Sequence, residues 1–173
     1  MSPQNLFASV KNEIIIKLRN INNIEFDFTQ STNKAVEVGS CYLAFPKKLK
    51  CIYRDNKNKE LIINNNSLAI TQKRYDKTYY YPISKSPFLN LLRKNELIKI
   101  IEEANLEELD NLIYLTYIGT DDQVFTIIFD NINFELQGWK MLDVFNNNIV
   151  FRIKIKSSNS NLDKELFKIP KLN

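Results

Sequence analysis

Histidine is absent from this chain of 173 residues. Serine–histidine catalytic sets, histidine-containing zinc sites and imidazole acid–base chemistry are therefore excluded. Only three glycines occur, Gly39, Gly119 and Gly138, so the chain has no glycine-rich loop of the kind that cradles phosphates. The two cysteines, Cys41 and Cys51, are too few for a four-cysteine zinc site. We expect no metal and no organic cofactor.

Signals for membranes, nucleic acids and catalysis are also scarce. No apolar run approaches the roughly 20 residues of a membrane-spanning helix, and residues 1–10 have neither the basic start nor the apolar stretch of a signal peptide. The net charge of +4 comes without a basic stripe, so nucleic acid is not an expected partner. Isolated carboxylates such as Asp143 and Asp163 suit turns or helix caps better than an active site. We therefore do not expect an enzyme.

Apolar and polar residues alternate along much of the chain between Ile24 and Lys156. In the first such segment, Ile24, Phe26 and Phe28 alternate with polar residues. Successive side chains of a strand point to opposite faces, so each segment has one apolar and one polar face. Many such strands predict an antiparallel sheet with one covered face. That face is either an ordinary core or the lining of a cavity for an apolar ligand.

The order of the predicted elements describes one domain. Residues 4–20 predict an amphipathic helix, because Leu6, Val10, Ile14 and Leu18 recur at intervals of four. The remaining elements are predicted as strands between 23 and 74 with breaks at 31–34, 46–48, 55–59 and 64–66, a short helix over 88–93, strands over 113–117, 125–129, 132–136 and 149–156, and a closing segment over 162–170. Since no linker or internal repeat interrupts them, we expect a single domain over residues 1–173.

Residues 39–53 predict a hairpin that turns near Pro46. The alternation favours a register in which Cys41 faces Cys51 and Leu43 faces Leu49. In that register the apolar side chains share one face: Cys41, Leu43, Phe45, Leu49, Cys51 and Tyr53. The two cysteines could form a disulfide in an oxidising compartment, or pack as two small apolar thiols.

Three segments, in chain order, carry a resemblance to a known family. They are Phe-Asp-Phe-Thr-Gln at 26–30, the glycine, proline turn and returning aromatic strand of 39–53, and the stretch that begins at Phe125, contains Gly138-Trp139 and Asp143, and ends at 163–167. Residues 61–63, 81–84 and 87–92 continue the pattern between them. The chain resembles the LolA family of periplasmic outer-membrane lipoprotein carriers, and 138–143 looks most like its alphaproteobacterial branch.

The resemblance implies an α+β fold, a half-open antiparallel β-barrel with helices that lid its concave apolar face, as in LolA and LolB. It implies a monomeric periplasmic carrier that binds the acyl chains of lipoproteins. The carrier would shuttle them from an inner-membrane ABC exporter of the LolCDE type to an outer-membrane acceptor. On this interpretation the chain is a mature form whose signal peptide is encoded upstream. A lidded apolar concavity suits acyl chains, because burial contributes about 0.8 kcal/mol per methylene.

The candidate lipid-binding residues are apolar side chains of the predicted cavity and lid: Phe26, Phe28, Leu43, Phe45, Leu49, Tyr53, Phe88, Leu91 and Leu92. Each could equally belong to an ordinary core. Tyr79, Tyr80 and Tyr81 could rim a lipid entrance or form a partly buried edge strand. Phe45 stands where many family members carry an arginine that latches the lid to the barrel, so a hydrophobic plug could hold the lid here. Trp139 is expected to be a structural anchor.

Other functions stay open. An outer-membrane acceptor of the LolB type would carry a lipidated N-terminal cysteine, which residues 2–11 lack. A sensor of lipoproteins or stress signals on a related barrel usually carries an extra domain, for which 173 residues leave little room. An enzyme on a similar barrel would need a catalytic set that is not evident. A purely structural module is a further alternative.

Overall fold

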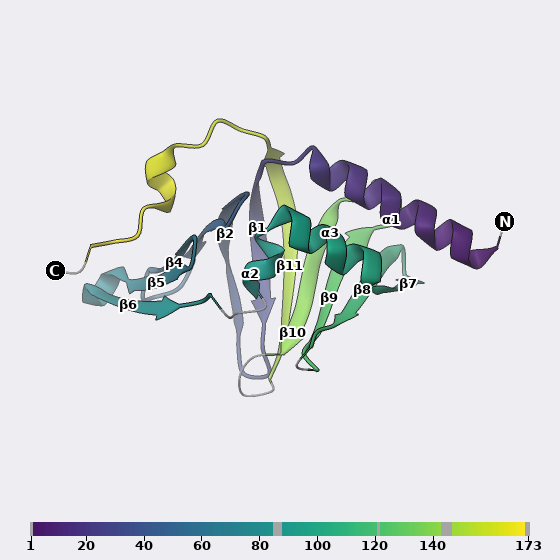
Figure 1. The fold of residues 1–173 in the computed structure, drawn as a ribbon. Coiled ribbons are helices and arrows are strands. Elements are labelled where there is room, and N and C mark those ends of the chain that lie inside the picture. The colour runs from purple at the N-terminus through teal and green to yellow at the C-terminus, as the bar shows by residue number, and fades with distance from the viewer. Residues whose placement is uncertain (1, 85–87, 121, 143–146, 172–173) are drawn as a thin grey trace. The chain divides into compact units, whose positions relative to one another are not determined.

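The computed structural model of the chain describes residues 2–84, 88–120, 122–142 and 147–171, without the side chain of Phe88. The chain forms one open antiparallel sheet of eleven strands with a few helices (Figure 1). The helices are α1 (Pro3–Arg19), α2 (Phe88–Leu91) and α3 (Lys94–Glu103), with 3₁₀ turns η1 (Lys73–Tyr75) and η2 (Lys164–Phe167). None of the helices in this described part is long and apolar enough to cross a membrane.

The strands are β1 (Asn23–Ser31), β2 (Val36–Ala44), β3 (Lys48–Tyr53), β4 (Lys59–Asn64), β5 (Ser67–Gln72), β6 (Lys77–Pro82), β7 (Asn105–Leu109), β8 (Leu112–Ile118), β9 (Val124–Asp130), β10 (Leu136–Leu142) and β11 (Asn148–Ser158). Their order in the sheet is β6-β5-β4-β3-β2-β1-β11-β10-β9-β8-β7. This order is linear and ends in two edge strands, so the sheet does not close on itself. The expected half-open antiparallel architecture is confirmed.

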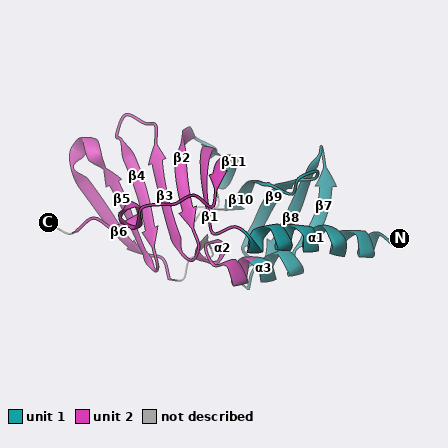
Figure 2. Cartoon of the chain, turned by 90° about the horizontal axis from the view of Figure 1, so that it is seen from above, with its two compact units in different colours: residues 1–20, 29–36, 98–154 teal, residues 21–28, 37–97, 155–173 magenta. Residues whose placement is uncertain are grey.

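The chain divides into two compact units (Figure 2). Unit 1 contains residues 1–20, 29–36 and 98–154, and unit 2 contains residues 21–28, 37–97 and 155–173. Each unit is assembled from three separate segments, so neither is a continuous stretch of chain. The single domain over residues 1–173 stays a prediction.

Unit 1 has an apolar core of buried side chains. One row of side chains runs across its strands in register: Leu106, Leu115, Ile127, Trp139 and Phe151. The Trp139 ring stacks on the Phe151 ring with their centroids 4.5 Å apart, and both side chains are buried. Stacked aromatic pairs add to the stabilisation that burial alone provides. Trp139 is therefore a structural anchor, as predicted.

Helix α1 contributes Ile14 and Ile15 to the buried residues of unit 1. The Lys11 ammonium donates to the backbone oxygens of Glu102 (2.8 Å) and Ala104 (2.6 Å), at the C-terminal end of α3. A cation there satisfies carbonyls that have no partner within the helix. Burial lowers the pKa of Lys11, although the Glu102 carboxylate acts in the opposite direction.

Three elements differ from the sequence-based expectation. A strand over 132–136 was predicted and is wrong, because Asp130 begins a turn in which its carboxylate accepts from the backbone nitrogens of Ile132 (2.8 Å) and Asn133 (2.9 Å). These two hydrogen bonds lower the pKa of Asp130. Phe134 then adopts a φ of 57°, and the strand β10 begins only at Leu136. Strand β7 and helix α3 were not predicted.

Unit 2 confirms the predicted hairpin of β2 and β3. Cys41 lies opposite Cys51 and Leu43 lies opposite Leu49, and the turn contains Pro46.

Of the two isolated carboxylates, Asp163 caps η2, since its carboxylate accepts from the backbone nitrogen of Glu165 at 2.9 Å. Asp143 lies outside the described residues.

Candidate functional site

The register of β2 to β6 sorts the side chains of unit 2 onto two faces, because residues directly opposite each other across antiparallel strands point the same way. We name one of them the apolar face. It consists of three rows that cross the five strands: Leu43, Leu49, Ile63, Leu68 and Tyr81; then Cys41, Cys51, Leu61, Ile70 and Tyr79; then Gly39, Tyr53, Lys59, Gln72 and Lys77. Two rows are thus apolar, and the third becomes polar toward β6.

Exposure increases across the apolar face from β2 to β6. The side chains of β2 and β3 on this face are buried, whereas Leu61, Leu68 and Ile70 are only half-buried. Tyr79 and Tyr81 on β6 are 43% and 46% exposed. A contiguous exposed apolar surface on a folded protein marks a place where something apolar binds. Strands β4 to β6 are therefore the candidate site.

The structure buries six of the nine residues predicted to bind lipid: Phe26, Phe28, Leu43, Leu49, Tyr53 and Leu92. Phe45 and Leu91 are half-buried, and the side chain of Phe88 lies outside the description. Leu43, Leu49 and Tyr53 lie on the apolar face, while Leu92 follows the last residue of α2. The contact of any of these residues with a lipid stays a prediction.

Phe28 and Tyr53 pack against each other at the buried β2–β3 end of the third row. Their rings meet edge to face at 5.0 Å between centroids. Gly39 is the β2 residue of this row, and a Cβ atom at this position would come within 2.7 Å of the Phe28 ring. The Lys59 ammonium lies 3.9 Å from the centre of the Tyr53 ring and pairs with Glu37. Burial raises the pKa of Tyr53, with smaller contributions from the carboxylates of Glu37 and Asp55.

Sequence reasoning missed Leu61, Leu68 and Ile70. They lie in the short continuous apolar runs 61–63 of β4 and 68–70 of β5, and such runs do not show by alternation which side chains share a face. The tyrosines of β6 separate by parity. Tyr79 and Tyr81 belong to the apolar face, whereas Tyr80 points to the opposite face and donates to the backbone oxygen of Pro170 at 2.9 Å.

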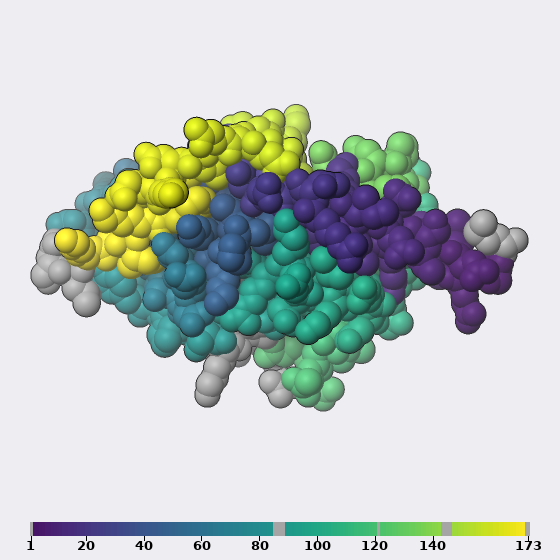
Figure 3. All heavy atoms as spheres, turned by 45° about the horizontal axis from the view of Figure 1, so that its top comes forward, coloured from purple at the N-terminus to yellow at the C-terminus, as the bar shows by residue number. Residues whose placement is uncertain are grey.

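The C-terminal segment covers the opposite face of unit 2. Figure 3 shows this segment in yellow against the blue-green atoms of the unit 2 strands. Turn η2 contacts β3 and β4, and Asn64 donates to the backbone oxygen of Phe167 at 3.1 Å. Phe167 is 3% exposed, and Ile62 and Ala69 on the same face are also buried. The opposite face thus has a small core of its own around Phe167, although Ile52 on this face remains 39% exposed.

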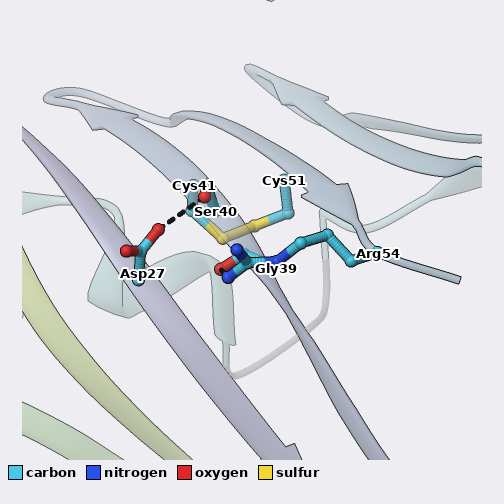
Figure 4. The surroundings of a disulfide bond; sticks show 6 residues. All are labelled: Asp27, Gly39, Ser40, Cys41, Cys51 and Arg54. Atoms are coloured by element: carbon cyan, nitrogen blue, oxygen red, sulfur yellow. Dashed lines mark hydrogen bonds between the residues drawn. A yellow bond between two sulfur atoms is a disulfide. The ribbon is translucent and has the colours of Figure 1, made fainter.

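Cys41 and Cys51 form a disulfide within the apolar face (Figure 4). The bond joins β2 to β3, and the cysteines are 0% and 3% exposed. The neighbouring Ser40 points to the opposite face and donates to the Asp27 carboxylate at 2.6 Å, as Figure 4 shows. The bond fixes the register of the hairpin that carries the predicted cavity residues.

Reduction of this disulfide is expected to lower the free energy of unfolding by about 2–3 kcal/mol, because a cross-link over a sequence separation of 10 residues restricts the unfolded chain. The measurement is urea unfolding with and without reductant. A Cys41→Ala/Cys51→Ala variant serves as the control, since reductant should not alter it. A shift below about 0.5 kcal/mol in the parent chain would contradict the prediction.

The Phe45–Pro46–Lys47 turn joins several segments of unit 2. The backbone nitrogen of Phe45 donates to the backbone oxygen of Asn22 (2.9 Å), and the backbone nitrogen of Lys47 donates to the backbone oxygen of Leu92 (2.7 Å). The Lys94 ammonium lies 5.4 Å from the centre of the Phe45 ring, which is within the range of a cation–π contact. The Phe45 ring is therefore met by a cation from α3.

The described residues contain no group of three or more cysteine, aspartate or glutamate side chains that could hold a metal ion.

Comparison with models of protein families identifies the family of the chain. The model described as outer membrane lipoprotein carrier protein LolA matches residues 19–170. The chain belongs to the LolA family. No curated protein matches it in sequence.

Solved structures resemble this LolA-family chain in fold at low sequence identity. The lipoprotein LppX of Mycobacterium tuberculosis is 11% identical with a TM-score of 0.50, over 94% of this chain and 99% of that one. LprF of Mycobacterium bovis is 9% identical with a TM-score of 0.51, and the match covers 94% of this chain and 97% of LprF. The MucA/MucB complex of Pseudomonas aeruginosa is 9% identical with a TM-score of 0.51, over 95% of this chain and 61% of that one. At these identities the similarity establishes the fold alone.

Proposed function

We propose that this LolA-family chain is a periplasmic carrier that binds the acyl chains of lipoproteins on the apolar face of unit 2. It receives them from an inner-membrane ABC exporter and delivers them to an outer-membrane acceptor. The observation that carries the proposal is the half-exposed apolar surface of β4 to β6. Five side chains form this surface: Leu61, Leu68, Ile70, Tyr79 and Tyr81.

The chemistry of that surface suits a cargo that must be released again. Its side chains come from adjacent strands and form a sheet of apolar contacts without a charged group in the first two rows. Each methylene that moves from water onto such a surface contributes up to about 0.8 kcal/mol. Since the surface is only half-buried before a ligand arrives, binding need not displace a packed core.

The buried residues Phe26 and Phe28 have a supporting part in this proposal. They lie on β1, the strand next to β2, and the Phe28 ring packs against Tyr53, so in the proposal they support the sheet on which the acyl chains rest. Phe45 and Leu91 belong to a movable cover in the proposal, because half-buried side chains rearrange at lower cost than core residues.

The test asks whether the purified chain releases a triacylated lipoprotein from inner-membrane spheroplasts that contain the exporter. We expect release into solution as a one-to-one complex, detected by size-exclusion chromatography. Serum albumin at the same concentration controls for non-specific extraction. Binding of lipoprotein without release would favour a sensor or an acceptor over a carrier, and the absence of any acyl binding would contradict the proposal altogether.

A further inference from the structure

The two units differ in charge. Unit 2 contains 16 of the 24 basic residues of the chain but only 9 of its 20 acidic ones, so its formal charge is +7 while that of unit 1 is −3. The unit that carries the apolar face is therefore strongly basic. A neutral acyl group makes no use of this charge, which prompts the question of where the cations of unit 2 gather.

Three basic residues occupy neighbouring backbone positions around the β2–β3 turn: Lys47, Arg93 and Lys94. The Lys47 backbone donates to Leu92, the residue directly before Arg93 and Lys94. The Lys94 ammonium lies over the ring of Phe45 in the same turn, at 5.4 Å. These contacts are all within unit 2.

Carboxylates are scarce at this end of unit 2. The segments that meet there, residues 21–22, 43–50, 61–68 and 88–95, contain no aspartate or glutamate. Glu96 in the first turn of α3 is the nearest acidic residue in sequence. Helix α3 also begins here, with Leu97 donating to the backbone oxygen of Arg93 at 2.9 Å, and the start of a helix favours negative charge.

Arg93 supplies an independent sign of a missing partner. Its Nε atom is buried and has no hydrogen-bond partner among the described residues. A buried donor of a charged group without an acceptor is costly and rare in folded proteins. An anionic oxygen that accepts from this nitrogen would remove the cost, and guanidinium groups bind phosphate and carboxylate oxygens through strong, charge-assisted hydrogen bonds.

The turn that contains Lys47 adjoins the buried end of the apolar face. Leu43 and Leu49 flank the turn that contains Lys47, and they begin the row that continues through Ile63 and Leu68 to Tyr81. A ligand with acyl chains along this row would place a polar head at the turn.

We propose that Lys47, Arg93 and Lys94 bind the anionic headgroup, a phosphate or a carboxylate, of a lipid whose acyl chain lies on the apolar face. The proposal rests on acyl binding by that face, as proposed above, and adds a second class of ligand. Anionic lipids use both the apolar rows and the cations, whereas a neutral acyl group uses the rows alone.

The experiment compares ligands with the same chain and different heads by isothermal titration calorimetry below their aggregation concentrations. The anionic probe is oleoyl lysophosphatidic acid, the neutral probe is mono-olein, and inorganic phosphate is titrated alone. We expect the anionic lipid to bind at least about tenfold more tightly than mono-olein, which corresponds to about 1.4 kcal/mol. Phosphate alone should bind weakly or not at all, because it lacks the contribution of the chain.

Two double variants test the residues. Arg93→Gln/Lys94→Gln should remove the preference for the anionic lipid and leave the affinity for mono-olein within about twofold. If this variant folds poorly, Lys47→Gln/Lys94→Gln tests the same site without altering the buried Arg93. The matched control, Lys57→Gln/Lys164→Gln, removes the same charge from exposed positions of unit 2 outside the apolar face and should keep the preference.

Each outcome decides a separate point. Equal binding of the two lipids by the parent chain would overturn the headgroup site and leave acyl binding intact. Failure of both lipids to bind would overturn acyl binding itself and the headgroup site with it. Phosphate that binds as tightly as the anionic lipid would show a site for a free anion and overturn its assignment to a lipid head. Loss of the preference in the control variant would assign it to net charge rather than to these three residues.

Discussion

Leu68→Asp is expected to weaken acyl binding by at least about a hundredfold, or about 2.8 kcal/mol. Leu68 lies half-buried in the first apolar row, between Ile63 on β4 and Tyr81 on β6. A carboxylate at this position would lose its hydration beneath an acyl chain without gaining a partner, and the burial of an unpaired charge is far more costly than the loss of one apolar contact. The measurement is titration with mono-olein or with a lipoprotein's acylated N-terminal peptide.

Ile52→Asp is the matched control for this variant. Ile52 is 39% exposed and lies on β3 with its side chain on the opposite face of the sheet. The same chemical change there should lower the free energy of unfolding to a similar extent, by about 1 kcal/mol, and leave acyl affinity unaltered. If Leu68→Asp bound acyl chains as well as Ile52→Asp does, the apolar face would not be the binding surface.

Phe167→Ala is expected to lower the free energy of unfolding by about 3–4 kcal/mol. Phe167 is 3% exposed, and its removal would uncover the opposite face at Ile62 and Ala69. The measurement is the urea unfolding midpoint, accompanied by the fluorescence of a dye that binds exposed apolar surface. The dye should bind the variant more strongly, because a second apolar surface becomes accessible to it.

Lys164→Ala in the same 3₁₀ turn controls for the change in the C-terminal segment. Lys164 is exposed, so its replacement should change the free energy of unfolding by no more than about 0.5 kcal/mol. A cost below about 1 kcal/mol for Phe167→Ala would mean that the segment does not seal the opposite face. The assignment of the C-terminal segment as the cover of the opposite face would then need revision.

The hairpin of β2 and β3 was the most predictable part of the molecule. A shift of one residue would have moved every apolar side chain of the hairpin to the other face, so the alternation around Pro46 left one register. That register correctly placed Cys41 opposite Cys51. The pattern could not decide between a disulfide and two thiols, because both occupy nearly the same space.

The errors in the predicted secondary structure have local causes. Ile132 and Phe134 imitate a strand by alternation, but the Asp130 side chain binds the backbone that a strand would need, and Ile132 ends 81% exposed. Helix α3 was predictable, since Leu97, Ile100 and Ile101 follow the spacing of an amphipathic helix.

The candidate site was only partly predictable. The sequence shows that Phe26 and Leu68 each lie in an apolar strand segment, but it does not reveal how much of that segment another part of the chain covers. The covering depends on residues far away in sequence, such as Phe167 over β3 and β4. Sequence reasoning therefore selected phenylalanines that are buried, and missed the aliphatic residues of β4 and β5 that remain half-buried.

The linear strand order also bears on how the protein behaves at high concentration. An open sheet has two edge strands whose outer backbone groups can pair with another chain, and such edges promote aggregation unless they are blunted. Strand β6 begins with Lys77 and ends with Pro82, and the five-residue strand β7 carries Glu107 and Glu108. A lysine, a proline, a short strand and exposed carboxylates all hinder pairing between edges. The sheet can therefore stay open for a ligand without becoming a template for fibrils.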